Sequence, residues 1–268
     1  MNYRLSRIAA ICGGKFSGCD SEVRSVVTDS RSLSCELGCR PMFVAMRGAN
    51  HDSHDFIAGM QSRGVRAFLV ERGVEASSCT GECGFVQVDN AIEALQRLAA
   101  YHRAQFRGTV VGITGSNGKT VIKEWIAEEL PEGMKYYRSP KSYNSQLGVP
   151  LSVLMLEGDE ELAIFEAGIS KPGEMERLER IIRPDAVIFT SIGDAHQENF
   201  INLEQKCDEK MILARSASKI IYHSYYEPLG RMVAAHFADR RPVDAAAYPE
   251  VPESVIGNAA SRRNAQIV

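Results

Sequence analysis

The chain has 268 residues, of which 44% are hydrophobic and 24% are charged, as in an ordinary globular protein. Its 31 basic and 34 acidic residues give a net charge of -3, which offers no electrostatic reason to expect nucleic acid as a partner. No apolar run approaches the roughly 18–20 residues that cross a bilayer, and no secretory signal opens the chain. We therefore expect a cytoplasmic protein with no membrane insertion.

The seven cysteines include two pairs with C-x3-C spacing and no pair with C-x2-C spacing. No histidines cluster beside them, so a structural zinc site is the weaker alternative. Free thiols are the simpler interpretation, because cytoplasmic proteins rarely contain disulfides.

The length predicts two domains, since domains commonly hold about 100–200 residues. In the first part of the chain, short apolar runs predict strands at 42–46, 67–70 and 85–88. Helical spacing predicts helices at 54–62 and 91–106, the second with Asp89 or Asn90 as its N-cap. Arg107-Gly108 then breaks the pattern, which sets a boundary between a domain at 1–107 and a domain at 108–268.

The second part alternates apolar runs with helical patterns. The expected strands are 109–114, 162–165, 186–190 and 219–222. The expected helices are 119–130, 173–182 and 203–216. This alternation predicts an α/β fold with a mostly parallel sheet that is covered by helices.

A glycine-rich segment between the strand at 109–114 and the helix at 119–130 has the context of a phosphate loop. Glycines there let backbone N–H groups point at phosphate oxygens, beside the positive end of the helix dipole. The lysine would bridge phosphates, and the threonine hydroxyl would bind Mg2+. The alternative is a glycine turn that binds nothing. The residues predicted to contact the nucleotide are Gly115, Ser116, Asn117, Gly118, Lys119 and Thr120.

The spacing of this loop departs from the common G-x4-G-K-T pattern, which would need glycine where the chain has Ile113. The compact form T-G-S-N-G-K-T resembles the phosphate loop of the Mur ligases and of the related folylpolyglutamate synthases. Mur ligases join amino acids to a UDP-linked cell-wall precursor at the expense of ATP. The resemblance therefore implies ATP and Mg2+ as cofactors.

Three later residues match the family's metal and catalytic positions. Glu166 ends an expected strand in a segment similar to the family's E-x-G motif, which implies that it binds Mg2+; a surface glutamate is the alternative. His196 follows the strand at 186–190, where the family carries a histidine beside a second metal ion, although a lone histidine is more often structural. Both would act on the phosphoryl group that is transferred.

Lys210 follows Glu204 by six residues, as in the family pattern whose lysine is carbamylated by CO2 and then binds metal. Only a neutral amine reacts with CO2, so a site that depresses the lysine pKa would favour the modification. An exposed helix lysine is the alternative, and Lys206 offers a rival register.

Other segments resemble the family's substrate contacts, most closely those of the MurF type. Asn144 precedes a G-V-P-L step and would contact the muramyl-peptide substrate, although Ser145 replaces a second asparagine of many relatives. Ser30 and Arg31 belong to a D-S-R motif and would contact the UDP end, unless Arg31 is only a salt-bridged turn residue. Asn264 matches an N-x2-N-A motif beside adenine, with Asn258 as an alternative register.

The resemblance implies a small α/β domain at 1–107 that binds the UDP precursor, followed by an ATP-binding domain at 108–268. The implied reaction adds D-alanyl-D-alanine to a UDP-N-acetylmuramoyl tripeptide through an acyl phosphate, with Lys119, His196 and Lys210 as catalytic residues. The family's C-terminal ligase domain is not found in this sequence, so we expect low activity from it alone. Alternatives are another Mur ligase of the MurE type, a folylpolyglutamate synthase-like ligase, or a non-catalytic nucleotide-binding fragment of a larger fusion, such as one with an alanine racemase.

Overall fold

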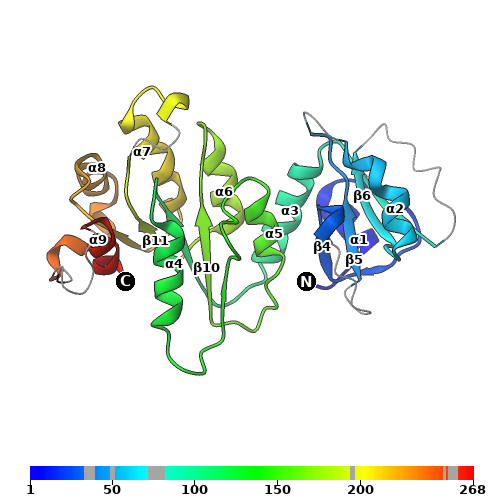
Figure 1. Cartoon of the computed structure of the whole chain (residues 1–268), viewed down its shortest axis with the longest axis horizontal. Coiled ribbons are helices and arrows are strands. Elements are labelled where there is room, and N and C mark those ends of the chain that lie inside the picture. Colours follow the sequence, from blue (N-terminus) through cyan, green and yellow to red (C-terminus); the bar gives the residue numbers. More distant parts are fainter. Residues whose placement is uncertain (33–39, 49–51, 72–81, 194–196, 250–251, 253–258) are drawn as a thin grey trace. The chain divides into compact units, whose positions relative to one another are not determined.

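The computed structural model describes residues 1–32, 40–48, 52–71, 82–193, 197–249, 252 and 259–268 (Figure 1). The chain forms two compact units. The first holds residues 1–105 and 153–157, and the second holds 106–152 and 158–268. The segment 153–157 belongs to the first unit, where the buried Leu154 and Leu156 pack and the Leu156 carbonyl contacts His102 Nε2 at 2.9 Å. Among the described residues, no helix has the length and apolar character that a membrane crossing requires.

The first unit is built on a five-stranded sheet with strand order β2-β7-β6-β5-β4. Only β2 runs antiparallel to its neighbour. A two-stranded antiparallel sheet pairs β1 (Tyr3–Arg4) with β3 (Glu22–Val23). The strands of the larger sheet are β2 (Lys15–Gly18), β4 (Ser25–Val27), β5 (Pro41–Val44), β6 (Ala67–Glu71) and β7 (Gly84–Val88). The helices are α1 (Leu5–Cys12), α2 (Ile57–Ser62) and α3 (Ala91–Arg103).

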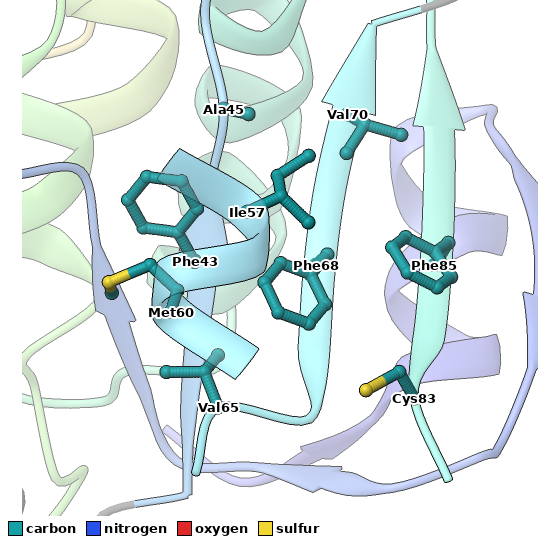
Figure 2. Close-up of a cluster of buried hydrophobic side chains, with 9 residues drawn as sticks. All are labelled: Phe43, Ala45, Ile57, Met60, Val65, Phe68, Val70, Cys83 and Phe85. Atoms are coloured by element: carbon teal, nitrogen blue, oxygen red, sulfur yellow. The ribbon is translucent and has the colours of Figure 1, made fainter. Parts of the chain in front are cut away.

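Aromatic side chains form the core between this sheet and α2. Figure 2 shows Phe68 at the centre of the cluster, with side chains of α2 packed against it. The Phe68 ring stacks on Phe85 with centroids 5.3 Å apart and meets Phe43 edge-on at 6.5 Å. Since successive side chains of a strand point to opposite faces, this face receives Phe68 and Val70 of β6.

The second unit is a six-stranded sheet with strand order β13-β12-β11-β8-β10-β9, and every pairing in it is parallel. Its strands are β8 (Thr109–Thr114), β9 (Tyr136–Arg138), β10 (Leu162–Ala167), β11 (Ala186–Phe189), β12 (Lys219–Tyr222) and β13 (Val243–Asp244). Its helices are α4 (Lys119–Glu128), α5 (Gly148–Val153), α6 (Glu174–Ile182), α7 (Leu203–Met211), α8 (Glu227–Phe237) and α9 (Ala259–Ile267). Strands β10, β8 and β11 are almost wholly buried, which explains their continuous apolar sequences.

The predicted α/β class with mostly parallel sheets is confirmed. The strand expected at 42–46 ends at Val44, because the Met46 N–H donates to Ser53 Oγ at 2.6 Å and not to a neighbouring strand. The helix expected from residue 54 starts as a 3-10 turn at 53–56, capped by Asp52, and becomes α-helical at Ile57. Asn90 is the N-cap of α3, since its side chain accepts from the Glu93 N–H at 3.0 Å.

The core of the first unit generates a stability prediction. Phe68→Ala removes a fully buried ring and should lower the free energy of unfolding by about 3–5 kcal/mol. Phe56→Ala is the matched control, because Phe56 lies in the same unit and is 48% exposed. Urea unfolding followed by far-UV circular dichroism compares the two variants. Equal losses in both would contradict the central place of Phe68 in this core.

Candidate functional site

Three adjacent strands of the second unit end at the same level. Thr114, the last residue of β8, pairs with Ala167 of β10 on one side and with Phe189 of β11 on the other. The segments that follow these strands therefore meet at one edge of the sheet. In open parallel sheets this carboxyl edge is where ligands bind.

The loop after β8 needs glycine at two positions. Gly115 has a φ of +149°, and a Cβ on it would lie 1.9 Å from Thr190 Oγ1. Gly118 has a φ of +86°, which an L side chain rarely adopts. A Cβ on Gly118 would lie 2.8 Å from Asn264 Nδ2, so the last helix of the chain packs directly against the loop. The loop is thus shaped for close approach of backbone to neighbouring groups.

The N-terminus of α4 presents backbone donors toward this edge. No side chain caps the helix, whose first N–H groups have no intrahelical acceptor. Part of the loop is closed by the segment after β11: the Ser116 N–H donates to the Ser191 carbonyl at 2.6 Å, and the Asn117 N–H donates to Ser191 Oγ at 3.1 Å. The donors that remain for an anion are those at the start of α4.

Lys119 folds back over the loop. Its ammonium donates to the Gly115 carbonyl at 2.8 Å and to the Ser116 carbonyl at 3.4 Å. Burial lowers the pKa of Lys119, while the nearby Glu166 charge partly offsets that effect. A phosphate group entering the loop would offer this ammonium a charged partner in place of two neutral carbonyls.

Thr120 and Glu166 meet beside the loop. The Thr120 hydroxyl donates to Glu166 Oε2 at 3.0 Å, and the Glu166 side chain is fully buried. Glu166 Oε1 lies 2.8 Å from Lys123 Nζ in an ion pair, and it accepts no hydrogen bond among the described residues. A buried carboxylate oxygen with open lone pairs next to a hydroxyl is a donor set that fits Mg2+.

Lys210 reaches the same loop from α7. Its side chain is buried, and its ammonium donates to the Gly115 carbonyl at 3.2 Å. Burial, followed by repulsion from Lys119 and Lys206, lowers the pKa of Lys210 to about 7. The amine is therefore largely neutral at mildly alkaline pH, as a reaction with CO2 requires. Lys206 is also buried but donates to the Gly193 carbonyl.

Asn144 lies beside the end of β10. Its backbone carbonyl accepts a hydrogen bond from the N–H of Gly168, the residue that follows this strand, at 2.8 Å. A Cβ on Gly168 would lie 3.1 Å from Asn144 Cγ, so the asparagine side chain packs over that glycine. The structure therefore gathers Lys119, Thr120, Glu166, Lys210, Asn144 and Asn264 around one edge of the second unit. His196 and Asn258 lie outside the described residues.

Ser30 and Arg31 lie in a 3-10 turn of the first unit. The Arg31 guanidinium donates two hydrogen bonds to the Asp29 carboxylate, at 3.0 and 2.9 Å, and these hold the pKa of Asp29 at about 2. The Arg31 side chain is nevertheless 89% exposed, which leaves its remaining donors accessible. The Ser30 carbonyl accepts from Arg63.

Sequence reasoning missed Lys123, whose ammonium lies against the Glu166 carboxylate. Its spacing is the signal that could have revealed it. Lys123 follows Lys119 by four residues and Thr120 by three, so all three share one face of α4. The described residues contain no group of three or more His, Cys, Asp or Glu side chains arranged to hold a metal ion.

Comparison with known proteins places this geometry in context. Residues 113–238 match the family model described as the Mur ligase middle domain. The UDP-N-acetylmuramoyl-tripeptide--D-alanyl-D-alanine ligase of Borreliella burgdorferi is 34% identical over 206 residues, which cover 73% of this chain and 44% of that protein. The chain spans less than half of the length of the curated relatives it matches here. Their names give no support to the alternative of a fused alanine racemase.

Solved structures give the same picture. MurF from Acinetobacter baumannii aligns with a TM-score of 0.78 and 25% identity, and the alignment covers 91% of this chain and 53% of that chain. MurF from Thermotoga maritima, solved in complex with ADP, aligns with a TM-score of 0.68 and 28% identity over 83% of this chain and 49% of that chain. Relatives found by sequence and by structure thus agree, and the chain belongs to the Mur ligase family.

Proposed function

We propose that this chain takes part in the ATP-dependent ligation of D-alanyl-D-alanine to a UDP-N-acetylmuramoyl tripeptide, the reaction named for its curated relatives. The observation that carries the proposal is the meeting of Lys119, Thr120 and Glu166 at the carboxyl edge of a parallel sheet. A magnesium-bound triphosphate requires a basic group for its phosphates, and a hydroxyl and a carboxylate for its metal ion. The ADP in the related Thermotoga structure supports nucleotide as the ligand.

The domains divide the work in this proposal. The first, residues 1–107, binds the UDP end of the precursor through Ser30 and Arg31, whose hydroxyl and guanidinium suit a diphosphate or uracil. The second, residues 108–268, binds ATP through Gly115, Ser116, Asn117, Gly118, Lys119 and Thr120, with Asn264 near the base. Asn144 contacts the muramyl peptide. The four described free thiols, Cys12, Cys19, Cys83 and Cys207, fit a reducing cytoplasm.

These residues contribute to the proposed reaction mainly through electrostatic stabilisation. The precursor carboxylate attacks the γ-phosphorus of ATP to give an acyl phosphate, and ADP leaves. The amine of D-alanyl-D-alanine then attacks the acyl carbon, phosphate leaves, and loss of a proton from the nitrogen gives the amide. Lys119 neutralises charge on the transferring phosphoryl group. Thr120 and Glu166 would hold Mg2+, joined in this proposal by His196 and carbamylated Lys210. The metal supplies charge stabilisation when bound.

The first test of the proposal is direct binding. The chain should bind ADP in the presence of Mg2+, measured by isothermal titration calorimetry, and ATP hydrolysis should require the UDP-muramyl tripeptide. A rate of ATP hydrolysis that is the same with and without the precursor would favour a nucleotide-binding module over a ligase. No ADP binding at any magnesium concentration would contradict the assignment of the loop.

Lys119→Ala tests the loop itself. It should weaken ADP binding by about 10–100-fold, the usual worth of a hydrogen bond to a charged group. Lys219→Ala is the control, because Lys219 is exposed at the start of β12 in the same unit. Calorimetric titration of both variants decides the matter, and equal affinity in the two would exclude Lys119 as a phosphate contact.

Carbamylation of Lys210 should depend on pH. With a pKa of about 7, roughly one-tenth of the amine is neutral at pH 6 and about nine-tenths at pH 8. A carbamate carbon signal from the chain in 13C-bicarbonate should therefore grow between these pH values in NMR spectra. The Lys210→Arg variant should lack that signal at every pH. A signal that persists in this variant would assign the carbamate to another lysine.

Arg31→Ala should weaken binding of the UDP precursor by about tenfold, a typical value for a charge-assisted contact. Arg24→Ala is a matched control, since Arg24 is also an exposed arginine paired with a carboxylate in the first unit. Fluorescence anisotropy with a labelled precursor compares the two. A larger loss in the Arg24 variant would move the precursor contact away from the D-S-R turn.

A further inference from the structure

One buried charge at the site has no role in the function proposed above. Lys123 lies on α4, one turn beyond Lys119, and its side chain is fully buried. A buried ammonium is costly to remove from water and persists only when nearby groups satisfy it. The groups around the Lys123 ammonium therefore indicate its role.

The Lys123 ammonium is surrounded by oxygen acceptors from three segments. It lies 2.8 Å from Glu166 Oε1 on β10, and that carboxylate is equally buried. It also donates to the Ser139 carbonyl at 2.7 Å and to the Lys141 carbonyl at 2.6 Å. Glu124 Oε1, the neighbour on the same helix, lies 3.4 Å away and is partly exposed.

We propose that Lys123 is a positioning residue that holds both the Glu166 carboxylate and the segment 139–144 in place before magnesium and substrate bind. The inference rests on the proposed function, because it takes Glu166 as a metal ligand. Lys123 touches neither nucleotide nor precursor in this assignment. It acts through the two groups that do.

The Glu166 carboxylate is the first group that Lys123 holds. A fully buried carboxylate needs a positive partner, and a bound divalent ion would provide one. Without the ion, Lys123 is the cation that lies against Glu166, and the Thr120 hydroxyl holds the other oxygen at 3.0 Å. The carboxylate is therefore kept in one orientation from two sides. A preorganised ligand of this kind costs little to reorganise when the metal arrives.

The segment 139–144 is the second group that Lys123 holds. Two of its carbonyls end on the same ammonium, and Lys141 adopts a φ of +50°, which a lysine rarely takes without support. The segment leads to Asn144, whose carbonyl is bonded to the backbone after Glu166. Lys123 thus ties the metal carboxylate and the predicted substrate asparagine to one helix.

The test is a double-mutant cycle on the whole chain in the absence of metal. Lys123→Met leaves Glu166 buried and unpaired, and should lower the thermal unfolding midpoint by about 10 °C. Adding Glu166→Gln to that variant removes the unpaired charge and should restore at least half of the loss. Lys219→Met, at an exposed position of the same unit, is the control and should leave the midpoint nearly unchanged. A double variant no more stable than Lys123→Met would overturn the pairing.

Two further readouts separate positioning from mere packing. Mg2+ with ADP should raise the midpoint of Lys123→Met by more than that of the unaltered chain, because the metal replaces the missing charge. Amide hydrogen exchange in 139–144 should be faster in Lys123→Met than in Lys219→Met. Equal metal shifts together with unchanged exchange would overturn the proposal. A failure of the unaltered chain to bind ADP with Mg2+ would instead defeat the proposed function, whatever the metal-free cycle shows.

Discussion

The candidate site depends on the in-register parallel pairing of β8 with β10 and β11. Because Thr114, Ala167 and Phe189 lie side by side, the loop, the carboxylate and the segment after β11 arrive at one edge without any long-range adjustment. A slip of one residue in the pairing of β8 with β10 would turn Glu166 to the opposite face of its strand. The long apolar sequences of these strands fit a sheet that is buried on both faces.

Around that edge the protein buries more positive than negative charge. Lys119 and Lys210 both donate to the Gly115 carbonyl, and Lys206 donates to the Gly193 carbonyl. Neutral carbonyls satisfy hydrogen-bond geometry but do not neutralise an ammonium group. The positive charge of these ammonium groups is therefore not balanced by their carbonyl partners, and the site favours an anion with several charges. Burial of these amines at the site lowers the pKa values of Lys119 and Lys210.

Much of this arrangement could be predicted from sequence, because the signals are local. A β-branched run followed by glycines and a lysine predicts strand, loop and helix, and β8 and α4 begin where expected. Helices α1 and α8 were missed, although Leu5, Ile8 and Ala9 of α1 and Leu229, Met232 and Val233 of α8 recur at helical spacing. In α8, Pro228 and Gly230 weaken the helical signal. Lys123 was missed for a different reason, because a lysine on a helix is usually exposed to solvent. Its burial becomes visible only in the structure, where α4 packs beside β10 and Lys123 meets Glu166.

The chain contains a single tryptophan, Trp125, and it lies on α4, the helix that begins at the phosphate loop. The indole therefore lies within two turns of the expected ligand, and the first unit contains no tryptophan. Emission from the indole reports on the second unit alone, while tyrosine signals come from both. The melting of the second unit can thus be followed by its indole emission without any added label.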